Sequence, residues 1–301
     1  MRRREFITLL AGLAAAWPLA ARGQRGERMR RIGVLLAVAE SDADVRKGIA
    51  IFQQRLQELG WRDCQNIRID YRWGDADPRR IQALAKELVE LHPDALVGHS
   101  TPSARGLLNQ TRSIPIVFLT VTDPLGQGLV SSLSRPNGNI TGFSVFEFSL
   151  GTKWVETLKQ IAPWYSTCDR HLQPGHCAVL RALFKINRCR CVFPGYRAHC
   201  GPSSQCRKRI IELAAEYRLP TIYYFRYFAS DGGLIAYGPD EMDLFQRTAG
   251  YVDRILKGTT PSDLPVQQPA KFELVINLKT AKAIGIQIPV ALLARADEVF
   301  E

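Results

Sequence analysis

The run from Ile114 to Pro124 (IPIVFLTVTDP) constrains the fold of this chain more than any other stretch. Ile116 to Leu119 are continuously apolar and rich in residues that favour strands, which is typical of a strand covered on both faces of a parallel sheet. Thr120, Thr122 and Asp123 then fall at the carboxyl end of that strand. Because open α/β sheets bind ligands beyond the carboxyl ends of their strands, we predict a binding site there.

The preceding unit has the same organisation. Residues 94–98 read as a buried strand, followed by Ser100 or Thr101 as a helix N-cap and Pro102 at the first helical position. Asp123 and Pro124 likewise resemble an N-cap followed by a first-turn proline. Free backbone N–H groups at such helix starts suit a carboxylate, but capping alone also explains these residue types. Both roles therefore stay open for each residue.

Strands and helices alternate regularly along the rest of the chain, which predicts parallel sheets wound with helices. The fold class is therefore α/β: two doubly wound parallel-sheet lobes with a cleft between them. We place a signal peptide at 1–28, a first lobe at 29–146 and a second lobe at 147–301, with a crossover near Phe146 and a tail, 266–301, that returns to the first lobe. Predicted strands are 32–38, 67–73, 94–98, 116–119, 139–145, 221–225 and 272–277; predicted helices are 44–59, 78–91, 149–163, 209–219, 241–256 and 280–284.

The net charge of +11 does not indicate nucleic-acid binding, because the excess is confined to two segments. Residues 1–31 hold eight basic and two acidic residues, and residues 164–208 hold eight basic and one acidic residue. The remaining parts are nearly neutral, so the folded domain presents no basic binding face.

The amino-terminal leader predicts export. Arg2, Arg3 and Arg4 precede an apolar run from Phe6 to Ala21, which fits a signal peptide and is short for a membrane span. The Arg3-Arg4 pair also resembles a twin-arginine signal, although a plain secretory signal would look similar. We therefore expect a periplasmic protein.

Several long runs together resemble the ABC-type substrate-binding proteins of the tryptophan/tyrosine-binding kind. These runs are IPIVFLTVTDPLGQGLVSSLSRPNGNITGFS, RYFASDGGLIAYGPD and SDLPVQQPAKFELVINLKTAKAIGI, and the similarity covers about residues 1–163 and 209–301. The resemblance implies a type I periplasmic clamshell that delivers a small solute to the membrane permease of an ABC importer, without catalysis or cofactor. It also implies a cleft lined by Ser100, Thr101, Thr120, Thr122, Asp123, Phe146, Phe225, Tyr237 and Asp240.

The residue chemistry agrees with an amino-acid-like or aromatic solute. Asp123 or Asp240 could hold an ammonium group, and Phe146, Phe225 or Tyr237 could stack on a ring. Each also has an ordinary structural explanation: the aromatic side chains fit a core, and the run from Tyr237 to Asp240 is a turn signal.

Residues 164–208 depart from the family. They contain six of the seven cysteines and three of the five histidines but no paired metal-ligand spacing, so we predict no metal site there. A disulfide knot is an alternative in an oxidising compartment. The codons from Asp169 to Gln205 can be read one base later, with the third base of each codon chosen freely among those permitted. The translation can then contain a strand, a capped turn, an amphipathic helix and a second strand, as in the family. We therefore predict a frameshifted, shortened and irregular segment, which leaves the second lobe incomplete.

Three other function classes compete with a solute receptor. A sensor domain is disfavoured because nothing follows the second lobe, and a hydrolase is disfavoured because no nucleophile elbow or catalytic triad is visible. The strongest alternative is a nonfunctional frameshifted relic of such a receptor. We expect a monomer whose partners are a small solute and a permease, with no nucleic acid.

Overall fold

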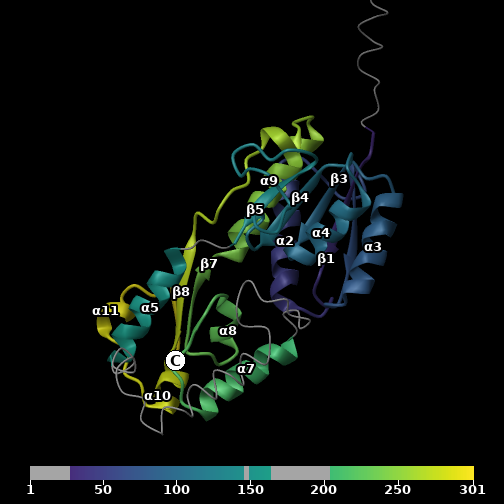
Figure 1. The fold of residues 1–301 in the computed structure, drawn as a ribbon. Coiled ribbons are helices and arrows are strands. Elements are labelled where there is room, and N and C mark those ends of the chain that lie inside the picture. Colours follow the sequence, from purple (N-terminus) through teal and green to yellow (C-terminus); the bar gives the residue numbers. More distant parts are fainter. Residues whose placement is uncertain (1–27, 146–148, 164–203) are drawn as a thin grey trace, which may run out of the picture.

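The computed structural model describes residues 28–145, 149–163 and 204–301, so Phe146 and most of the cysteine-rich segment lie outside it. The described chain forms two sheets, each covered by helices, in two lobes that lie end to end (Figure 1). The predicted two-lobed α/β architecture is confirmed.

The first lobe contains five parallel strands in the order β2-β1-β3-β4-β5. Strands β3, β4 and β5 are buried along their whole length, as expected for a parallel sheet covered on both faces. The strands are β1 (Arg30–Leu36), β2 (Ile67–Trp73), β3 (Ala95–His99), β4 (Ile116–Val121) and β5 (Ile140–Ser144), connected by helices α2 (Ala43–Glu58), α3 (Pro78–Glu90) and α4 (Ser100–Gln110).

The second lobe contains four strands in the order β6-β7-β8-β9. Helices α5, α10 and α11 pack on one face of this sheet, and α7 and α8 pack on the other. The elements are β6 (Ile222–Tyr223), β7 (Ile235–Pro239), β8 (Phe272–Asn277), β9 (Glu298–Phe300), α5 (Ser149–Ile161), α7 (Ser204–Glu216), α8 (Arg226–Ser230), α10 (Leu278–Ile284) and α11 (Val290–Leu293).

Strand β8 runs antiparallel to β7, whereas the sequence predicted a parallel second sheet. The reason is the path of the chain: β7 leaves toward the first lobe, and β8 returns from it beside the end of β7, where Pro239 pairs with Phe272. The second sheet is therefore mixed.

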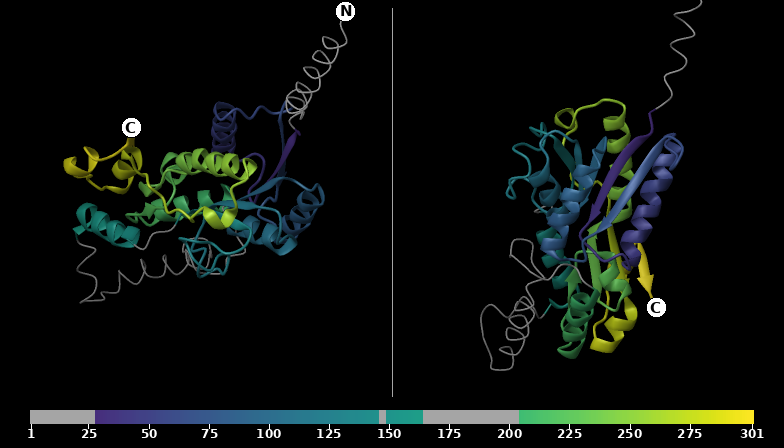
Figure 2. Two further views of the ribbon diagram at one scale, coloured as in Figure 1. Left: turned by 90° about the horizontal axis from the view of Figure 1, so that it is seen from above. Right: turned by 90° about the vertical axis from the view of Figure 1, so that its right-hand side faces the viewer.

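The lobe boundaries also differ from those predicted. Helix α9 (Glu241–Leu256) packs against α2 and β4 of the first lobe, where Leu244, Phe245 and Val252 join its core. The 3-10 helix η2 (Pro261–Asp263) lies beside β5 in the same lobe. The tail from β8 onward belongs instead to the second lobe, which holds the C-terminus (Figure 2). Periodicity predicted a helix at 241–256 but could not say which sheet it would cover.

The local structure differs from the prediction at two helix starts and at one turn. Helix α4 begins at Ser100, and its N-cap is His99, which makes no side-chain capping bond. No helix follows Asp123: residues 124–128 form turns, in which Asp123 Oδ1 accepts from Gly126 N at 2.9 Å. The predicted turn at Tyr237 to Asp240 is the end of strand β7 followed by the N-cap of α9.

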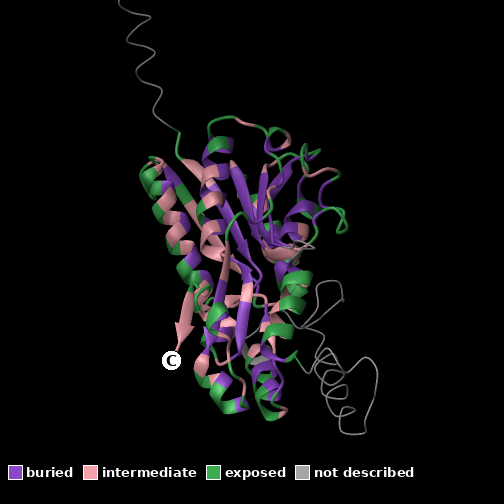
Figure 3. Cartoon of the chain, turned by 90° about the vertical axis from the view of Figure 1, so that its left-hand side faces the viewer, coloured by how far each residue is buried: buried purple, intermediate pink, exposed green. Residues whose placement is uncertain are grey.

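Burial follows the two sheets. Buried residues line the strands of both lobes, and exposed residues lie on the outer faces of the helices (Figure 3). Among the described residues, no helix has the length and apolar character needed to cross a membrane.

Gly142 supplies a test of the sheet geometry. Its φ is +152°, and a Cβ at this position would lie 2.0 Å from the Phe118 carbonyl oxygen of β4. Since backbone cannot move aside cheaply, Gly142→Ala should lower the free energy of unfolding by about 1–3 kcal/mol in urea titrations. Gly250→Ala in α9 is the control: nothing lies within 4 Å, so it should be neutral or stabilising by up to about 1 kcal/mol. Equal stability of the Gly142 variant and the parent would contradict the described contact.

Candidate functional site

The carboxyl ends of β3 and β4 carry strained backbone. Ser100, Thr120 and Asp123 have φ values of 73°, 55° and 46°. Positive φ is uncommon outside glycine and is an outlier for a β-branched residue such as Thr120. Such strain of about 1–3 kcal/mol per residue clusters at functional sites. The two strand ends at which the sequence predicts a binding site therefore have strained backbone as well as polar side chains.

Polar atoms without partners gather at the start of α4. The imidazole nitrogens of His99 and the hydroxyls of Ser100 and Ser103 are buried and make no hydrogen bond in the described part of the chain. Burial lowers the pKa of His99 to about 4, and the nearby Asp42 carboxylate opposes this only in part. A neutral imidazole has one donor and one acceptor nitrogen. These groups, together with the N-terminal N–H groups of α4, are available to a ligand.

The other predicted binding residues of the first lobe differ in how exposed they are and in whether their polar atoms already have partners. Thr120 is buried and its hydroxyl donates to the Leu119 carbonyl at 2.7 Å. Thr101, in the first turn of α4, and Thr122, after β4, are partly exposed. Asp123 is exposed and its carboxylate serves the turn that follows β4. The strand ends thus bring Ser100, Thr101, Thr120 and Thr122 to one edge of the sheet, whereas Asp123 has a local structural role.

An open hollow of about 440 Å³ lies at the same edge of the first sheet, beyond the carboxyl ends of β1 and β2. Its walls include Glu40 and Ser41, which directly precede Asp42, the N-cap of α2. Further lining residues are Ala39, Tyr71, Arg72, Trp73, Asp75, Arg80 and Leu84.

Aromatic side chains of the second lobe form a connected cluster around the start of α8. Phe225, the N-cap of α8, packs at 4.7 Å from Tyr224 and 5.1 Å from Tyr227, measured between ring centres. Trp154 of α5 meets Tyr224 edge-on at 5.7 Å. The Tyr224 hydroxyl donates to the Val145 carbonyl at the end of the first lobe. The aromatic cluster therefore touches the first lobe beside the crossover.

Tyr237 meets that cluster only through its backbone, and its ring packs elsewhere. Its ring stacks on Phe272 at 6.3 Å, and its carbonyl accepts from Trp154 Nε1 at 2.8 Å. The hydroxyl lies 3.3 Å from Lys153 Nζ. These contacts explain Tyr237 as a packing residue between β7, β8 and α5.

Charged side chains meet where α2, α9, α7 and α8 approach one another. Arg207 of α7 lies 3.7 Å from Asp44 of the first lobe and 2.7 Å from Asp231 of the second. Its guanidinium carbon also lies 4.5 Å from the centre of the Tyr227 ring. We call Asp42, Asp44, His99, Arg207, Tyr227, Asp231 and Glu241 the interlobe cluster.

Within the interlobe cluster, the pKa of the Glu241 carboxyl group is strongly raised. Burial raises its pKa to about 8, and the carboxylates of Asp44 and Asp42 raise it further in the same direction. Burial also raises the pKa of Tyr227 well above its usual value. Strongly perturbed groups of this kind are typical of functional sites, although structural charge networks perturb pKa values as well.

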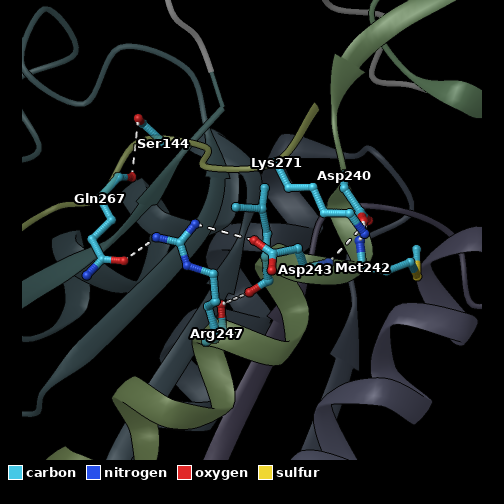
Figure 4. A network of polar contacts seen from close by, with 9 residues as sticks. Ser144, Asp240, Met242, Asp243, Arg247, Gln267 and Lys271 are labelled. Atoms are coloured by element: carbon cyan, nitrogen blue, oxygen red, sulfur yellow. Dashed lines mark hydrogen bonds and ion pairs between the residues drawn. The ribbon is translucent and has the colours of Figure 1, made fainter. Parts of the chain in front are cut away.

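Both carboxylate oxygens of Asp240 have partners within the fold. One of its carboxylate oxygens accepts from the N–H groups of Met242 and Asp243 and so caps α9, and the other lies 2.7 Å from Lys271 Nζ (Figure 4). Burial acts to raise the Asp240 pKa, but these hydrogen bonds outweigh it and the pKa is lowered. The residue holds the segment that joins β7 to α9.

A second polar group in Figure 4 holds the segment that precedes β8. Arg247 of α9 lies 3.4 Å from Asp243, and its guanidinium donates to the Gln267 side chain. The Gln267 backbone pairs with β5, since Ser144 N donates to Gln267 O and Gln267 N donates to Gly142 O, both at 2.9 Å. These bonds fix the chain where it passes between the lobes.

Sequence reasoning missed most of the interlobe cluster. Asp42 had a readable signal, because it caps α2 through Asp44 N and Val45 N, each at 3.1 Å. His99 could have been selected as the residue that ends a buried strand beside Ser100. Arg207 and Glu241 had no such signal, because they reach the site only through the packing of α7 and α9. Among the described residues no group of His, Cys, Asp and Glu is arranged to hold a metal ion.

Comparisons with known proteins agree on one family. A family model described as ABC transporter substrate binding protein matches residues 31–178 and 203–300. The chain is 28% identical over 292 residues to a tyrosine-binding protein of Clostridioides difficile (strain R20291), covering 87% of this chain and 82% of that protein.

Solved structures show the same similarity. An ABC domain from Streptococcus pneumonia in complex with L-Trp is 25% identical, with a TM-score of 0.74 over 90% of this chain and 99% of that chain. A conserved domain protein from Vibrio cholerae is 26% identical, with a TM-score of 0.72 over 90% of this chain and 100% of that chain. The family match spans both lobes, which favours a receptor over a relic, although it does not test the frameshift. The chain belongs to the ABC transporter substrate-binding protein family.

Proposed function

We propose that this protein is the non-catalytic solute receptor of an ABC importer for an aromatic amino acid, of which tyrosine and tryptophan are the leading candidates. Two observations, one in each lobe, carry this proposal. Buried polar groups without partners lie at the start of α4, and the aromatic cluster of the second lobe contacts the first lobe at Val145. The relatives described as tyrosine-binding and L-Trp-bound support the same solute class.

The solute carboxylate is assigned to the start of α4. Ser100 and Thr101, with the free N–H groups of the first turn, provide donors and the positive end of the helix dipole. Thr120 and Thr122 border this position from β4. The ring of the solute packs against Phe225 and the neighbouring tyrosines. Phe146 retains its predicted role as a ring contact, and Asp123, Tyr237 and Asp240 are assigned to structure rather than to binding.

The cellular setting follows from the leader and from the charge distribution. We infer that the protein is exported to the periplasm, by the twin-arginine or the general secretory route, and acts as a monomer that delivers its solute to a membrane permease. The nearly neutral lobes give no reason to expect nucleic acid as a partner.

The proposal is tested by calorimetric titration of the exported protein with L-tyrosine, L-tryptophan, L-phenylalanine and L-leucine. Aromatic amino acids should bind and leucine should bind about 2- to 13-fold more weakly, because a ring stacked on aromatic side chains contributes about 0.5–1.5 kcal/mol beyond its buried area. Methyl esters of the bound amino acids should lose affinity, since the ester is uncharged. Absence of binding to all four amino acids would reject the proposal and restore the relic hypothesis.

Two variants separate binding from local structure at the first-lobe edge. Ser100→Gly suits the positive φ but removes the hydroxyl, so it should weaken tyrosine binding about tenfold, as expected for one lost hydrogen bond to a charged group. Asp123→Ala removes only a turn contact and should leave affinity unchanged while lowering stability by about 1 kcal/mol. The reverse pattern in the titrations would show that Asp123, rather than Ser100, contacts the solute.

Export makes a separate prediction. The mature protein should begin between Ala21 and Arg28, because the apolar run ends there and β1 starts at Arg30. N-terminal sequencing of periplasmic protein checks this, and recovery of Met1 would contradict it. Replacing Arg3 and Arg4 by lysine should block export only if the twin-arginine route is used.

A further inference from the structure

The interlobe cluster holds more negative than positive charge among the described residues. Asp42 and Asp44 lie at the start of α2, Glu241 at the start of α9, and Asp231 at the end of α8. Arg207 is the cation within ion-pair distance, and it is directed at Asp44 and Asp231. Asp42 and Glu241 therefore have no ion-pair partner in the described structure.

Neither of these two carboxyl groups has hydrogen-bond partners for both of its oxygens among the described residues. Asp42 caps α2 through Oδ1 alone, which leaves Oδ2 without a hydrogen bond to a described residue. Glu241 likewise makes no side-chain hydrogen bond in the described part of the chain, although it is partly buried. These two carboxyl groups lie in an acidic environment without a cation of their own among the described residues, so a cationic group that enters this position would be attracted.

His99 provides an independent indication of a ligand at the same place. The imidazole is only 5% exposed, and both of its nitrogens lack partners. It stacks on Phe245 at 5.8 Å between ring centres. Phe245 lies one helical turn after Glu241 on the same face of α9. The imidazole thus lies beside the turn that carries Glu241, and Asp42 interacts electrostatically with both side chains.

We propose that Asp42, Glu241 and His99 form a subsite for the α-ammonium group of the solute, an assignment that rests on the proposed amino-acid function. An ammonium group has three N–H donors. Asp42 Oδ2, the Glu241 carboxylate and the acceptor nitrogen of neutral His99 supply three acceptors. This assignment replaces Asp123 and Asp240, which were predicted to hold the ammonium but serve a turn and a helix cap.

The subsite predicts a linkage between binding and pH. Free Glu241 is largely protonated below its pKa of about 8, so an ammonium that requires the carboxylate must displace its proton. Tyrosine affinity should therefore rise as the pH rises from 6 to 8. His99, with a pKa of about 4, stays neutral throughout this range.

Other charged groups facing Glu241 must be distinguished from it. Asp42 and Asp44 around α2, Asp240 before α9, Glu273 on β8 and Tyr227 on α8 interact electrostatically with Glu241. Arg207, Lys47 and Asp231 interact with Asp44 in the next layer of charges. Burial raises the pKa of Glu273 to about 7, so it titrates in the same range. Its strongest charged neighbour is Arg226 of the second lobe, which makes Glu273→Gln a matched control.

The experiment compares L-tyrosine with 3-(4-hydroxyphenyl)propionate, which lacks the ammonium, by calorimetry on the exported protein. Glu241→Gln should weaken tyrosine binding about 10- to 100-fold at pH 8 and abolish the pH dependence, as expected for loss of a charged hydrogen-bond partner. Its effect on the deaminated probe should be within about threefold, because an uncharged position makes no ion pair. Glu273→Gln should keep the tyrosine affinity at pH 8 and the rise of affinity with pH, with a midpoint at lower pH because Glu273 no longer raises the Glu241 pKa.

Thermal unfolding separates this effect from misfolding. Removal of one carboxylate from a group of like charges should leave the melting temperature of Glu241→Gln unchanged or higher. If Glu241→Gln binds tyrosine as tightly as the parent, or weakens both probes equally, the subsite is wrong while the receptor function stands. If the parent binds neither tyrosine nor tryptophan, the proposed function itself fails.

Discussion

The passage of the chain between the lobes is the constraint on which the rest of this structure depends. The chain leaves the first lobe after Val145, returns to it at Asp240 and leaves again after Gln267. Backbone bonds hold these segments together: Gln267 pairs with β5, and Asp240 N donates to Lys271 O at 3.0 Å. These bonds hold the described ends of the crossing segments beside one another where the two lobes meet.

This arrangement explains why α9 matters for function. The helix is anchored in the first lobe by apolar packing against α2, so close that a Cβ on Gly48 would lie 2.3 Å from the Phe245 ring. Its N-terminus nevertheless follows directly from β7 of the second lobe. Glu241 therefore lies where the lobes meet, held by the core of one lobe and by the strand of the other. A solute that binds there would contact both lobes at once, which is how binding can stabilise a closed receptor.

Electrostatics and strain point to the same region. Ser100 and Thr120 adopt backbone conformations that their side chains disfavour, and His99 and Ser100 have buried polar atoms without partners among the described residues. Each of these features costs stability in the unliganded protein, and a ligand that supplies the missing partners recovers part of that cost. Asp240 and Arg247, by comparison, have hydrogen-bond partners within the fold, which is consistent with a structural role.

The sequence by itself determined the elements and the polar edge of the first sheet. Apolar runs such as Ile116 to Leu119 specify buried strands through local chemistry, and β2, α9 and β8 begin and end where periodicity placed them. Ser100 and Thr120 were identifiable because they directly follow such strands. Only the tertiary structure decided that α9 covers the first sheet, that β8 runs antiparallel, and that Asp42, His99, Arg207 and Glu241 meet. The physical reason is that an amphipathic helix specifies which of its faces is buried but not which sheet buries it, and contacts between residues far apart in sequence depend on that choice.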